Sequence, residues 1–268
     1  MSLMINLEKC IGCGLCTKDC VAGCLEIEDG HAVLAKQLCI SCGHCVAICP
    51  ENAVSIPEYR MDLVKEITPE DMQTDPVKLQ KFMSARRSIR QFQSREVEQE
   101  NLEAILETGR MSPTAANRQS LRFVVIRDQL PQFRRMVVEA LNANADAIAG
   151  KLASPRYRDK FPRMLEALEN GGDPLYFGAP AVIMVIERGG DIANGAMAAS
   201  RMELMASALG LGCCYNGFTA IAAAHDPDIL NFLNCGPADR IAMTFALGYP
   251  SVIYRRTAPR KPLRAEWL

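Results

Sequence analysis

The sequence CIGCGLCTKDC at residues 10–20 recurs, with the same spacing of its four cysteines, as CISCGHCVAICP at residues 39–50. Eight of the chain's twelve cysteines lie in these two runs. Three thiolates on a tight loop, with a fourth from outside it, suit the corners of a [4Fe-4S] cube, whereas a tetrahedral zinc ion usually takes two pairs of ligands. The spacing therefore predicts two iron-sulfur clusters and argues against zinc.

The two runs belong to a longer internal repeat. Residues 10–27 overlay residues 39–56 at an offset of 29, with matching cysteine, isoleucine and glycine positions. The overlay separates two candidate ligands, because Cys24 falls opposite Ala53, a small apolar position, while Cys20 falls opposite a cysteine of the second run. We therefore predict that Cys24 is a small buried residue and that Cys20 is the ligand.

This first stretch resembles the bacterial two-cluster ferredoxins over about its whole length, with Val21 where the first run of that family carries proline. In those proteins the fourth cysteine of each run ligates the other cluster. The resemblance implies one cluster on Cys10, Cys13, Cys16 and Cys49, and a second on Cys39, Cys42, Cys45 and Cys20.

Length and composition limit the class of protein. A chain of 268 residues can form one small domain and one ordinary domain with its own core. Disulfides would be an unusual use of cysteines at this spacing, which favours a reducing compartment. No run approaches the roughly twenty apolar residues of a membrane span, and the first residues lack the pattern of a secretory signal. We therefore expect a cytoplasmic protein with no membrane partner.

Charge is distributed unevenly along the chain. The formal net charge is −1, and residues 1–57 hold six acids and three bases, a net of −3, which leaves +2 for the remainder. This balance gives no overall attraction to nucleic acid. A polar, acidic stretch that contains Pro69 follows and is typical of a linker. We predict a cluster domain at 1–57, a linker at 58–79 and a second domain at 80–268.

Two kinds of apolar pattern alternate in the second domain. Short apolar runs predict strands at 123–126, 181–186 and 241–247, and helical spacing predicts helices that include 102–106, 133–141 and 202–209. This alternation indicates an α+β or α/β arrangement built on one sheet. Residues 131–180 contain helical patches interrupted by glycine and proline, which suits either a mobile cover over a site or a surface insertion.

A basic cluster, Arg86, Arg87, Ser88 and Arg90, opens the second domain. Three guanidinium groups and a hydroxyl within five residues can hold a phosphate through charge-assisted hydrogen bonds. Taken alone, the cluster could equally be a solvated helix end or a nucleic-acid patch.

The wider sequence around this cluster resembles the FMN-dependent nitroreductase family. The motifs, in the order and spacing of that family, are SARRSIRQF at 84–92, MSPTAANRQ at 111–119, LGLGCCYNG at 209–217, LGYP at 247–250 and PRK at 259–261. The resemblance covers nearly all of residues 80–268. It implies an α/β sandwich, in which helices flank a central mixed sheet, and an intertwined homodimer that binds FMN.

The resemblance also implies where FMN binds. Arg86, Arg87 and Ser88 match the stretch that holds the phosphate and ribityl chain, and Arg90 matches a basic residue near the pyrimidine side of the flavin. The implied C-terminal phosphate contacts are Arg260 and Lys261. Arg255 and Arg256 either serve the same anion or lie on the surface.

Two further segments are implied to reach the flavin ring. The residues that match the contribution of the partner subunit are Ser112, Pro113, Thr114, Ala115 and Asn117. The residues that match the loop near the central ring are Tyr215, Asn216 and Gly217. That loop is one residue shorter than in some relatives and lacks a glutamate sometimes found there.

No side-chain nucleophile is expected, because a flavin carries the redox chemistry itself. Cys213 and Cys214 could form a redox pair, but a reactive thiol needs exposure and a lowered pKa. We predict that both are small buried residues. His31, His44 and His225 are scattered, and His44, inside a cluster loop, is expected to tune or pack rather than titrate.

The two halves together predict an FMN-dependent oxidoreductase. Iron-sulfur clusters pass single electrons and a flavin holds one or two, so the chain could couple one-electron transfer to two-electron reduction of a nitroaromatic, a quinone or another conjugated acceptor. The donor could be NAD(P)H or a reduced ferredoxin. The alternatives are an electron-transfer protein that serves protein partners, and another chemistry of this fold such as reductive dehalogenation or flavin fragmentation.

Overall fold

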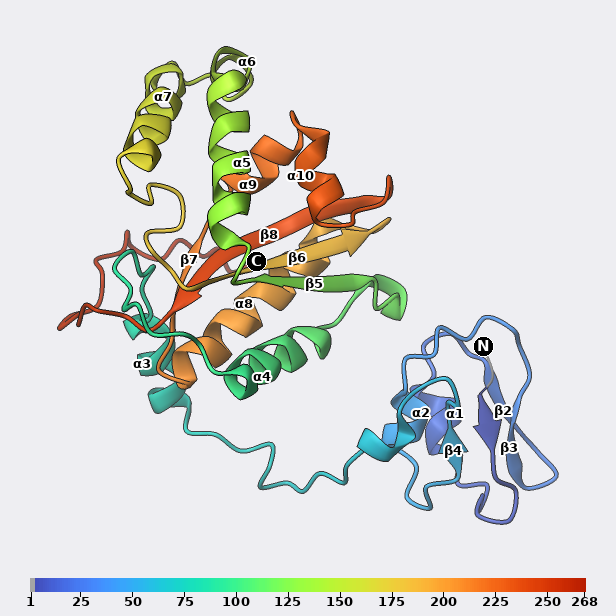
Figure 1. Ribbon diagram of the computed structural model, residues 1–268. Coiled ribbons are helices and arrows are strands. Elements are labelled where there is room, and N and C mark those ends of the chain that lie inside the picture. The colour runs from blue at the N-terminus through green and yellow to red at the C-terminus, as the bar shows by residue number, and fades with distance from the viewer. Residues whose placement is uncertain (1–2) are drawn as a thin grey trace. The chain divides into compact units, whose positions relative to one another are not determined.

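The computed structural model describes residues 3–268, which form two compact units (Figure 1). The first unit contains the chain up to Thr74 together with Thr114–Arg118. The second contains Asp75–Pro113 and Gln119–Leu268.

The first unit repeats one short motif twice. Its helices are α1 (Leu15–Asp19) and α2 (His44–Ala47), and each follows a glycine with positive φ, Gly14 at 71° and Gly43 at 77°. Only glycine adopts this conformation at low cost, which accounts for a glycine at the same place in both runs. The strands pair antiparallel, β1 (Met4–Ile5) with β4 (Val54–Ser55) and β2 (Leu25–Glu28) with β3 (His31–Leu34).

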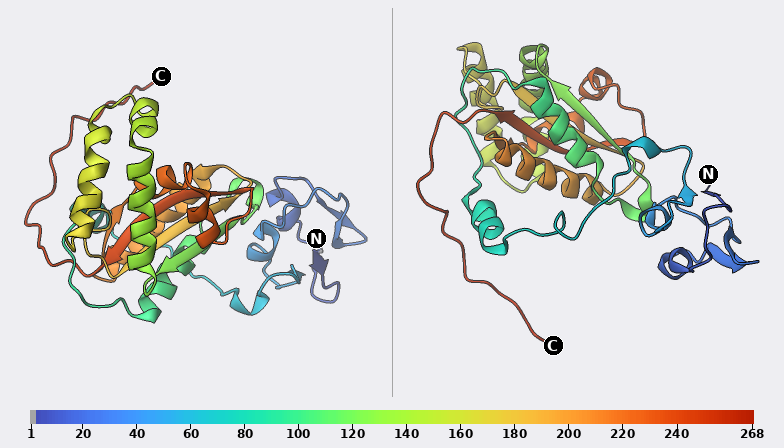
Figure 2. Two further views of the ribbon diagram at one scale, coloured as in Figure 1. Left: turned by 45° about the horizontal axis from the view of Figure 1, so that its top comes forward. Right: turned by 90° about the horizontal axis from the view of Figure 1, so that it is seen from below.

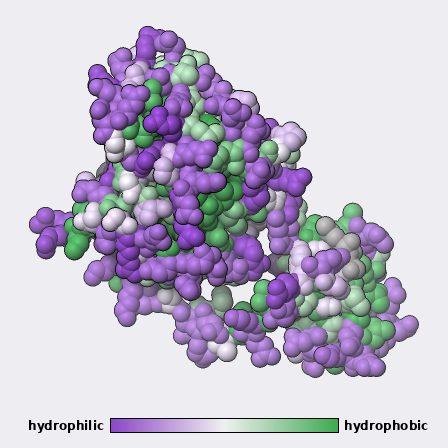
Figure 3. Space-filling model, in the orientation of Figure 1, coloured by the Kyte–Doolittle hydropathy of each residue, from purple (hydrophilic) through white to green (hydrophobic). Residues whose placement is uncertain are grey.

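The apolar core of the first unit is small. One cluster of buried residues contains Cys16, Leu25 and Ala32. Large apolar side chains are exposed, including those of Ile11 and Val21, and Figure 3 shows hydrophobic residues in green on this unit. So small a core stabilises a domain weakly, and a bound metal centre can supply the missing free energy of folding.

The segment after this core is exposed. It contains one short 3-10 helix, η1 (Met61–Leu63). The helix α3 (Pro76–Ala85) begins inside the predicted linker: Asp75 caps it by accepting hydrogen bonds from the backbone N–H groups of Val77 (2.9 Å) and Lys78 (3.1 Å). An aspartate before a proline at the first helical position is a typical N-terminal signal of a helix.

The second unit is built on one sheet in the order β5-β6-β8-β7. Its strands are β5 (Leu121–Ile126), β6 (Ala181–Arg188), β7 (Gly212–Tyr215) and β8 (Asp239–Gly248). All neighbouring strands run antiparallel, and the parallel component is an isolated bridge between Ser88 and Cys213. In β6 every residue from 181 to 187 is buried, as the continuous apolar run predicted.

Helices cover both faces of this sheet, as Figure 2 shows. One face packs against α4 (Gln99–Arg110) and α8 (Ile192–Ala208). The other shares one apolar cluster with α5 (Leu130–Ala143), α7 (Arg156–Glu169), α9 (Phe218–Ala223) and α10 (Pro227–Phe232), in which α7 packs on α5. The two remaining short helices are α6 (Ala145–Lys151) in this unit and η2 (Ala115–Asn117) in the first. The predicted sandwich is confirmed.

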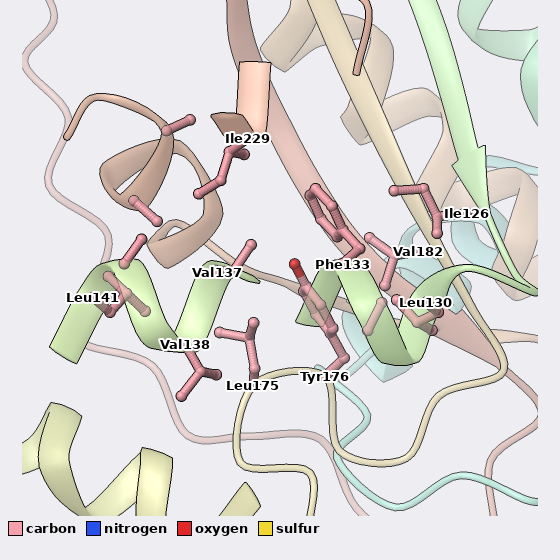
Figure 4. Packing of buried hydrophobic residues seen from close by; sticks show 14 of the residues in the cluster. Ile126, Leu130, Phe133, Val137, Val138, Leu141, Leu175, Tyr176, Val182 and Ile229 are labelled. Carbon is pink, nitrogen blue, oxygen red and sulfur yellow. The ribbon is translucent and has the colours of Figure 1, made fainter. Parts of the chain in front are cut away.

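The interpretation of residues 131–180 as a cover or a surface insertion was wrong. Phe133 and Val137 of α5, Phe161 of α7 and Tyr176 have fully buried side chains. Figure 4 shows Phe133 and Val137 of α5 beside Leu175 and Tyr176 of the loop that leads to β6. The glycines and prolines that suggested a loose segment separate or interrupt helices whose apolar faces form the core on one side of the sheet.

Residues 251–268 form no helix or strand, and nearly all of them are exposed. Among the described residues, no helix is both long enough and apolar enough to cross a membrane.

Candidate functional site

The first unit contains two cysteine-lined pockets. One is lined by four cysteines: Cys10, Cys13, Cys16 and Cys49. The other is lined by five: Cys20, Cys24, Cys39, Cys42 and Cys45. The fold thus brings together the two groups of four that the resemblance to ferredoxins implies, with the fourth cysteine of each run in the pocket of the other run.

Cys24 lies at the second pocket but has a different environment. Its side chain is 1% exposed, which confirms the prediction of a small buried residue. Burial is also the main reason why the pKa of its thiol is raised.

Backbone N–H groups point at several of the sulfur atoms. Cys10 Sγ accepts from Ala32 N, Cys49 Sγ from Ala53 N, and Cys20 Sγ from Cys24 N, each at 3.3 Å. Hydrogen bonds of this kind hold negative charge on sulfur and tune the potential of an iron-sulfur cluster. The donor set therefore fits iron-sulfur clusters.

Across residues 3–268, no three Cys, His, Asp or Glu side chains converge closely enough to hold a single metal ion.

In the second unit, the Arg86–Arg90 segment runs beside strand β7. Ile89 N donates to Cys213 O at 2.9 Å, and Ser88 forms a parallel bridge with the same residue. Ile89 is buried and fills the space that a side chain at Gly212 would need. Two of the sequence motifs implied to hold FMN, one near residue 88 and one near residue 214, therefore lie side by side.

Arg86 is held by a buried carboxylate. It forms an ion pair with Glu203 of α8, and the two side chains are 26% and 7% exposed. Burial raises the pKa of Glu203, while Arg86 and the Tyr215 hydroxyl act in the opposite direction. Sequence reasoning missed Glu203, although a lone acid within the apolar, Ala- and Met-rich stretch 193–209 was a visible signal.

The other cations of the implied FMN site are differently placed. Arg87 lies 5.9 Å from the ring centre of Tyr254, and Arg90 lies 6.0 Å from that of Phe177. Within residues 3–268, none of the following makes an ion pair with a carboxylate: Arg87, Arg90, Arg255, Arg256, Arg260 and Lys261. These guanidinium and ammonium groups can therefore bind an external anion such as a phosphate. Arg255, Arg256, Arg260 and Lys261 lie in the exposed C-terminal segment.

Residues 112–117 match the segment that reaches the flavin site of the partner subunit in the family. They are divided between the two compact units. Ser112 and Pro113 belong to the second unit, where the Ser112 hydroxyl is buried and meets no hydrogen-bond partner among the described residues. Thr114, Ala115 and Asn117 belong to the first unit. There the Asn117 side-chain amide donates to Ser41 O at 2.7 Å, in the loop between Cys39 and Cys42.

The loop after β7 is fixed by Asn216. Its side-chain oxygen accepts from Thr219 N at 3.1 Å, its amide donates to Leu175 O at 2.9 Å, and its backbone N–H donates to Thr244 O at 2.8 Å. The neighbouring Gly217 is exposed, and Tyr215 is only 36% exposed. Asn216 therefore fixes the backbone of the loop between Tyr215 and Gly217.

Cys213 and Cys214 are buried, with 2% and 4% exposure, as predicted. Burial raises the pKa of both thiols. Neither thiol is therefore suited to act as a nucleophile or a redox pair.

Comparison with known proteins shows the family of the chain. The family description "Nitroreductase family" matches residues 83–249, more than half of the chain. The chain belongs to the nitroreductase family. This confirms the resemblance and the class of an FMN-dependent oxidoreductase. A second description, "4Fe-4S dicluster domain", matches residues 2–70 and confirms that the N-terminal part is an iron-sulfur domain of the ferredoxin type.

Individual relatives of this nitroreductase family member are distant. An iodotyrosine deiodinase from Haliscomenobacter hydrossis is 24% identical over 174 residues, which cover 63% of this chain and 75% of the relative. A nitroreductase with bound FMN from Bacteroides fragilis has a TM-score of 0.58 at 19% identity, covering 72% of this chain and all of its own. A nitroreductase with bound FMN from Desulfitobacterium hafniense has a TM-score of 0.52 at 21% identity, covering 70% of this chain and 97% of its own. The two structures support the fold.

Proposed function

We propose that the protein couples one-electron transfer through two [4Fe-4S] clusters to the two-electron reduction of a conjugated small molecule, such as a nitroaromatic or a quinone, at an FMN site. The observation that carries this proposal is that one chain contains two cysteine-lined pockets, each of which includes the four cysteines assigned to one cluster, and also the paired Arg86–Arg90 and β7 segments. FMN, when bound, supplies the exchange between one-electron and two-electron chemistry.

The chain's own residues would have separate tasks. The eight cysteines would hold the clusters, and the backbone N–H groups of Ala32, Ala53 and Cys24 would stabilise charge on sulfur. Arg87 and Ser88 would bind the phosphate end of FMN, and Arg90 would lie near the pyrimidine side of the flavin. The loop fixed by Asn216 would border the ring. A homodimer with shared sites would complete each FMN pocket, in line with the implied role of Ser112–Asn117.

The substitution Cys45→Ser tests the direction of electron flow. Cys45 lines the second cysteine pocket only, so its loss should remove one cluster and leave the second unit folded. If the clusters are the inlet, turnover driven by reduced ferredoxin falls at least tenfold while turnover driven by NAD(P)H is retained. Cys235→Ser is the matched control, because that cysteine lies in the second unit and outside both pockets. Equal loss of both activities with FMN still bound would contradict the inlet role.

A second candidate is reductive dehalogenation, which the similarity to an iodotyrosine deiodinase favours. Both reactions would use the same FMN site. Product analysis with a halogenated phenol and a nitroaromatic as competing acceptors separates them: release of halide without nitro reduction would favour dehalogenation.

A further inference from the structure

Glu203 is an unusual residue for its place in the fold. It lies on the face of α8 that packs against the sheet, where Ala199, Met202 and Ala206 are fully buried. Placing a carboxylate there costs several kcal/mol unless a cation pairs with it. That cation is Arg86, the first residue of the basic cluster.

The ion pair between Arg86 and Glu203 changes the net charge of the basic cluster at residues 86–90. The sequence offers three guanidinium groups within five residues, at positions 86, 87 and 90. Glu203 cancels the charge of Arg86, while Arg87 and Arg90 have no carboxylate partner among the described residues. The segment therefore presents two uncompensated cations instead of three.

The other groups that face Glu203 are neutral. Cys213 and Tyr215 project from β7, and burial raises the pKa of both, so that thiol and phenol stay protonated near neutral pH. The charge next to Glu203 is therefore set mainly by its ion pair with Arg86.

We infer that Glu203 sets the charge of the FMN site: by cancelling Arg86, its carboxylate holds down the reduction potential of bound FMN. This inference rests on the proposed function. Its physical basis is Coulombic, because reduction adds negative charge to the flavin and a nearby carboxylate opposes that change. In a partly buried site the opposition is stronger than in water. Glu203 is thus a positioning and charge-setting residue that need not touch substrate.

The test is the FMN potential of Glu203→Gln, measured at pH 8 in the full-length holoprotein by spectroelectrochemistry, with cluster oxidation states followed by EPR. Glutamine keeps the shape and a hydrogen-bond acceptor for Arg86 but removes the charge. The two-electron equilibrium between oxidised and reduced FMN should shift at least tenfold toward the reduced form. This shift corresponds to a reduction potential about 30 mV higher than in the wild-type protein. FMN should also bind more tightly, because Arg86 becomes an uncompensated cation beside an anionic cofactor.

Two further variants separate charge from structure. In Glu203→Gln with Arg86→Gln the pair is again neutral, so the equilibrium should return to within about threefold of the wild-type value. Glu187→Gln is the matched control, because Glu187 is also fully buried but hydrogen-bonds to Ser120 at the opposite end of the sheet. It should leave the FMN potential unchanged.

Three outcomes would overturn the inference: an unchanged or lowered potential in Glu203→Gln, a shift that persists in the double variant, or an equal shift in the Glu187 control. If the glutamine variant fails to fold, Glu203→Met removes the same charge with similar volume and carries the same expectation. Failure of the wild-type protein to bind FMN would refute the proposed function itself, whereas bound FMN with no shift refutes the inference alone.

Discussion

Ile89 donates its backbone N–H to the carbonyl of Cys213 at 2.9 Å. This bond fixes the basic segment that follows α3 against strand β7, although the two are far apart in the sequence. It gives the Arg86–Arg90 cluster a defined backbone instead of a mobile helix end. The interpretation of the cluster as a solvated helix end is therefore wrong, because Ile89 is buried and Arg86 pairs with a buried acid.

Arg87→Ala should weaken FMN binding by roughly ten- to a hundredfold, because a hydrogen bond to a charged group contributes about 1.5–3 kcal/mol. Quenching of FMN fluorescence on titration with apoprotein measures the dissociation constant. Arg163→Ala is the control: it removes an exposed arginine on α7 that has no carboxylate partner in the described part of the chain. If the two variants bind FMN with equal affinity, Arg87 does not contribute to the phosphate site.

Removal of iron should unfold the first unit and spare the second. The cluster of three buried residues in the first unit is too small to stabilise it alone, whereas the second has two extensive apolar clusters. Hydrogen exchange after anaerobic chelation should show loss of protection in residues 4–55 and retained protection in β6 and α8. Retained protection in both units would mean that the cysteine pockets fold without metal.

Phe133→Ala should destabilise the second unit by about 3–5 kcal/mol, because the ring is fully buried and its loss leaves a cavity. Chemical denaturation followed by far-UV circular dichroism gives the free energy of unfolding. Val77→Ala on the exposed α3 should change it by less than about 0.5 kcal/mol. Similar small effects in both variants would show that α5 is not part of the core.

Glu98 should contribute stability that is lost in acid. The Tyr249 hydroxyl donates to its carboxylate at 2.5 Å, and this hydrogen bond, with those from its own backbone and from Arg95, lowers the pKa of Glu98 to about 2. A depressed carboxyl pKa stabilises the folded state above the unfolded value, near 4.3, and that stability disappears as pH falls toward 2. The melting temperatures of wild type and Glu98→Gln should therefore differ at pH 7 and converge near pH 2. A constant difference across this range would contradict the assignment.

The cysteine pockets were the most predictable part of the molecule. The cysteine spacing predicted two clusters, and the resemblance to two-cluster ferredoxins implied which four cysteines belong to each. The internal repeat favoured Cys20 over Cys24 as the ligand. The strands β5, β6 and β8 were also predicted, since long apolar runs are unambiguous in a buried sheet.

The remaining features depend on tertiary contacts that local sequence does not encode. Strand β7 has four residues and is defined by pairing with β8 and with the segment at Ser88. The pairing of Glu203 with Arg86 joins residues far apart in the chain, so neither position alone reveals it. In residues 131–180, the helical spacing of α5 was predicted, but Gly171, Gly172 and Pro174 gave the stretch a loop-like composition that concealed its place in the core and the amphipathic face of α7.

An anaerobic visible titration of the holoprotein tests whether electrons pass between the iron-sulfur clusters and the flavin. The protein is mixed with NADH, then NADPH, then reduced ferredoxin, while the flavin band is followed and the clusters are monitored by EPR. Electrons that enter at the clusters should bleach the flavin band, and a nitroaromatic or a quinone should then restore it. A flavin that stays oxidised while both clusters are fully reduced would contradict the coupling of the two cofactors.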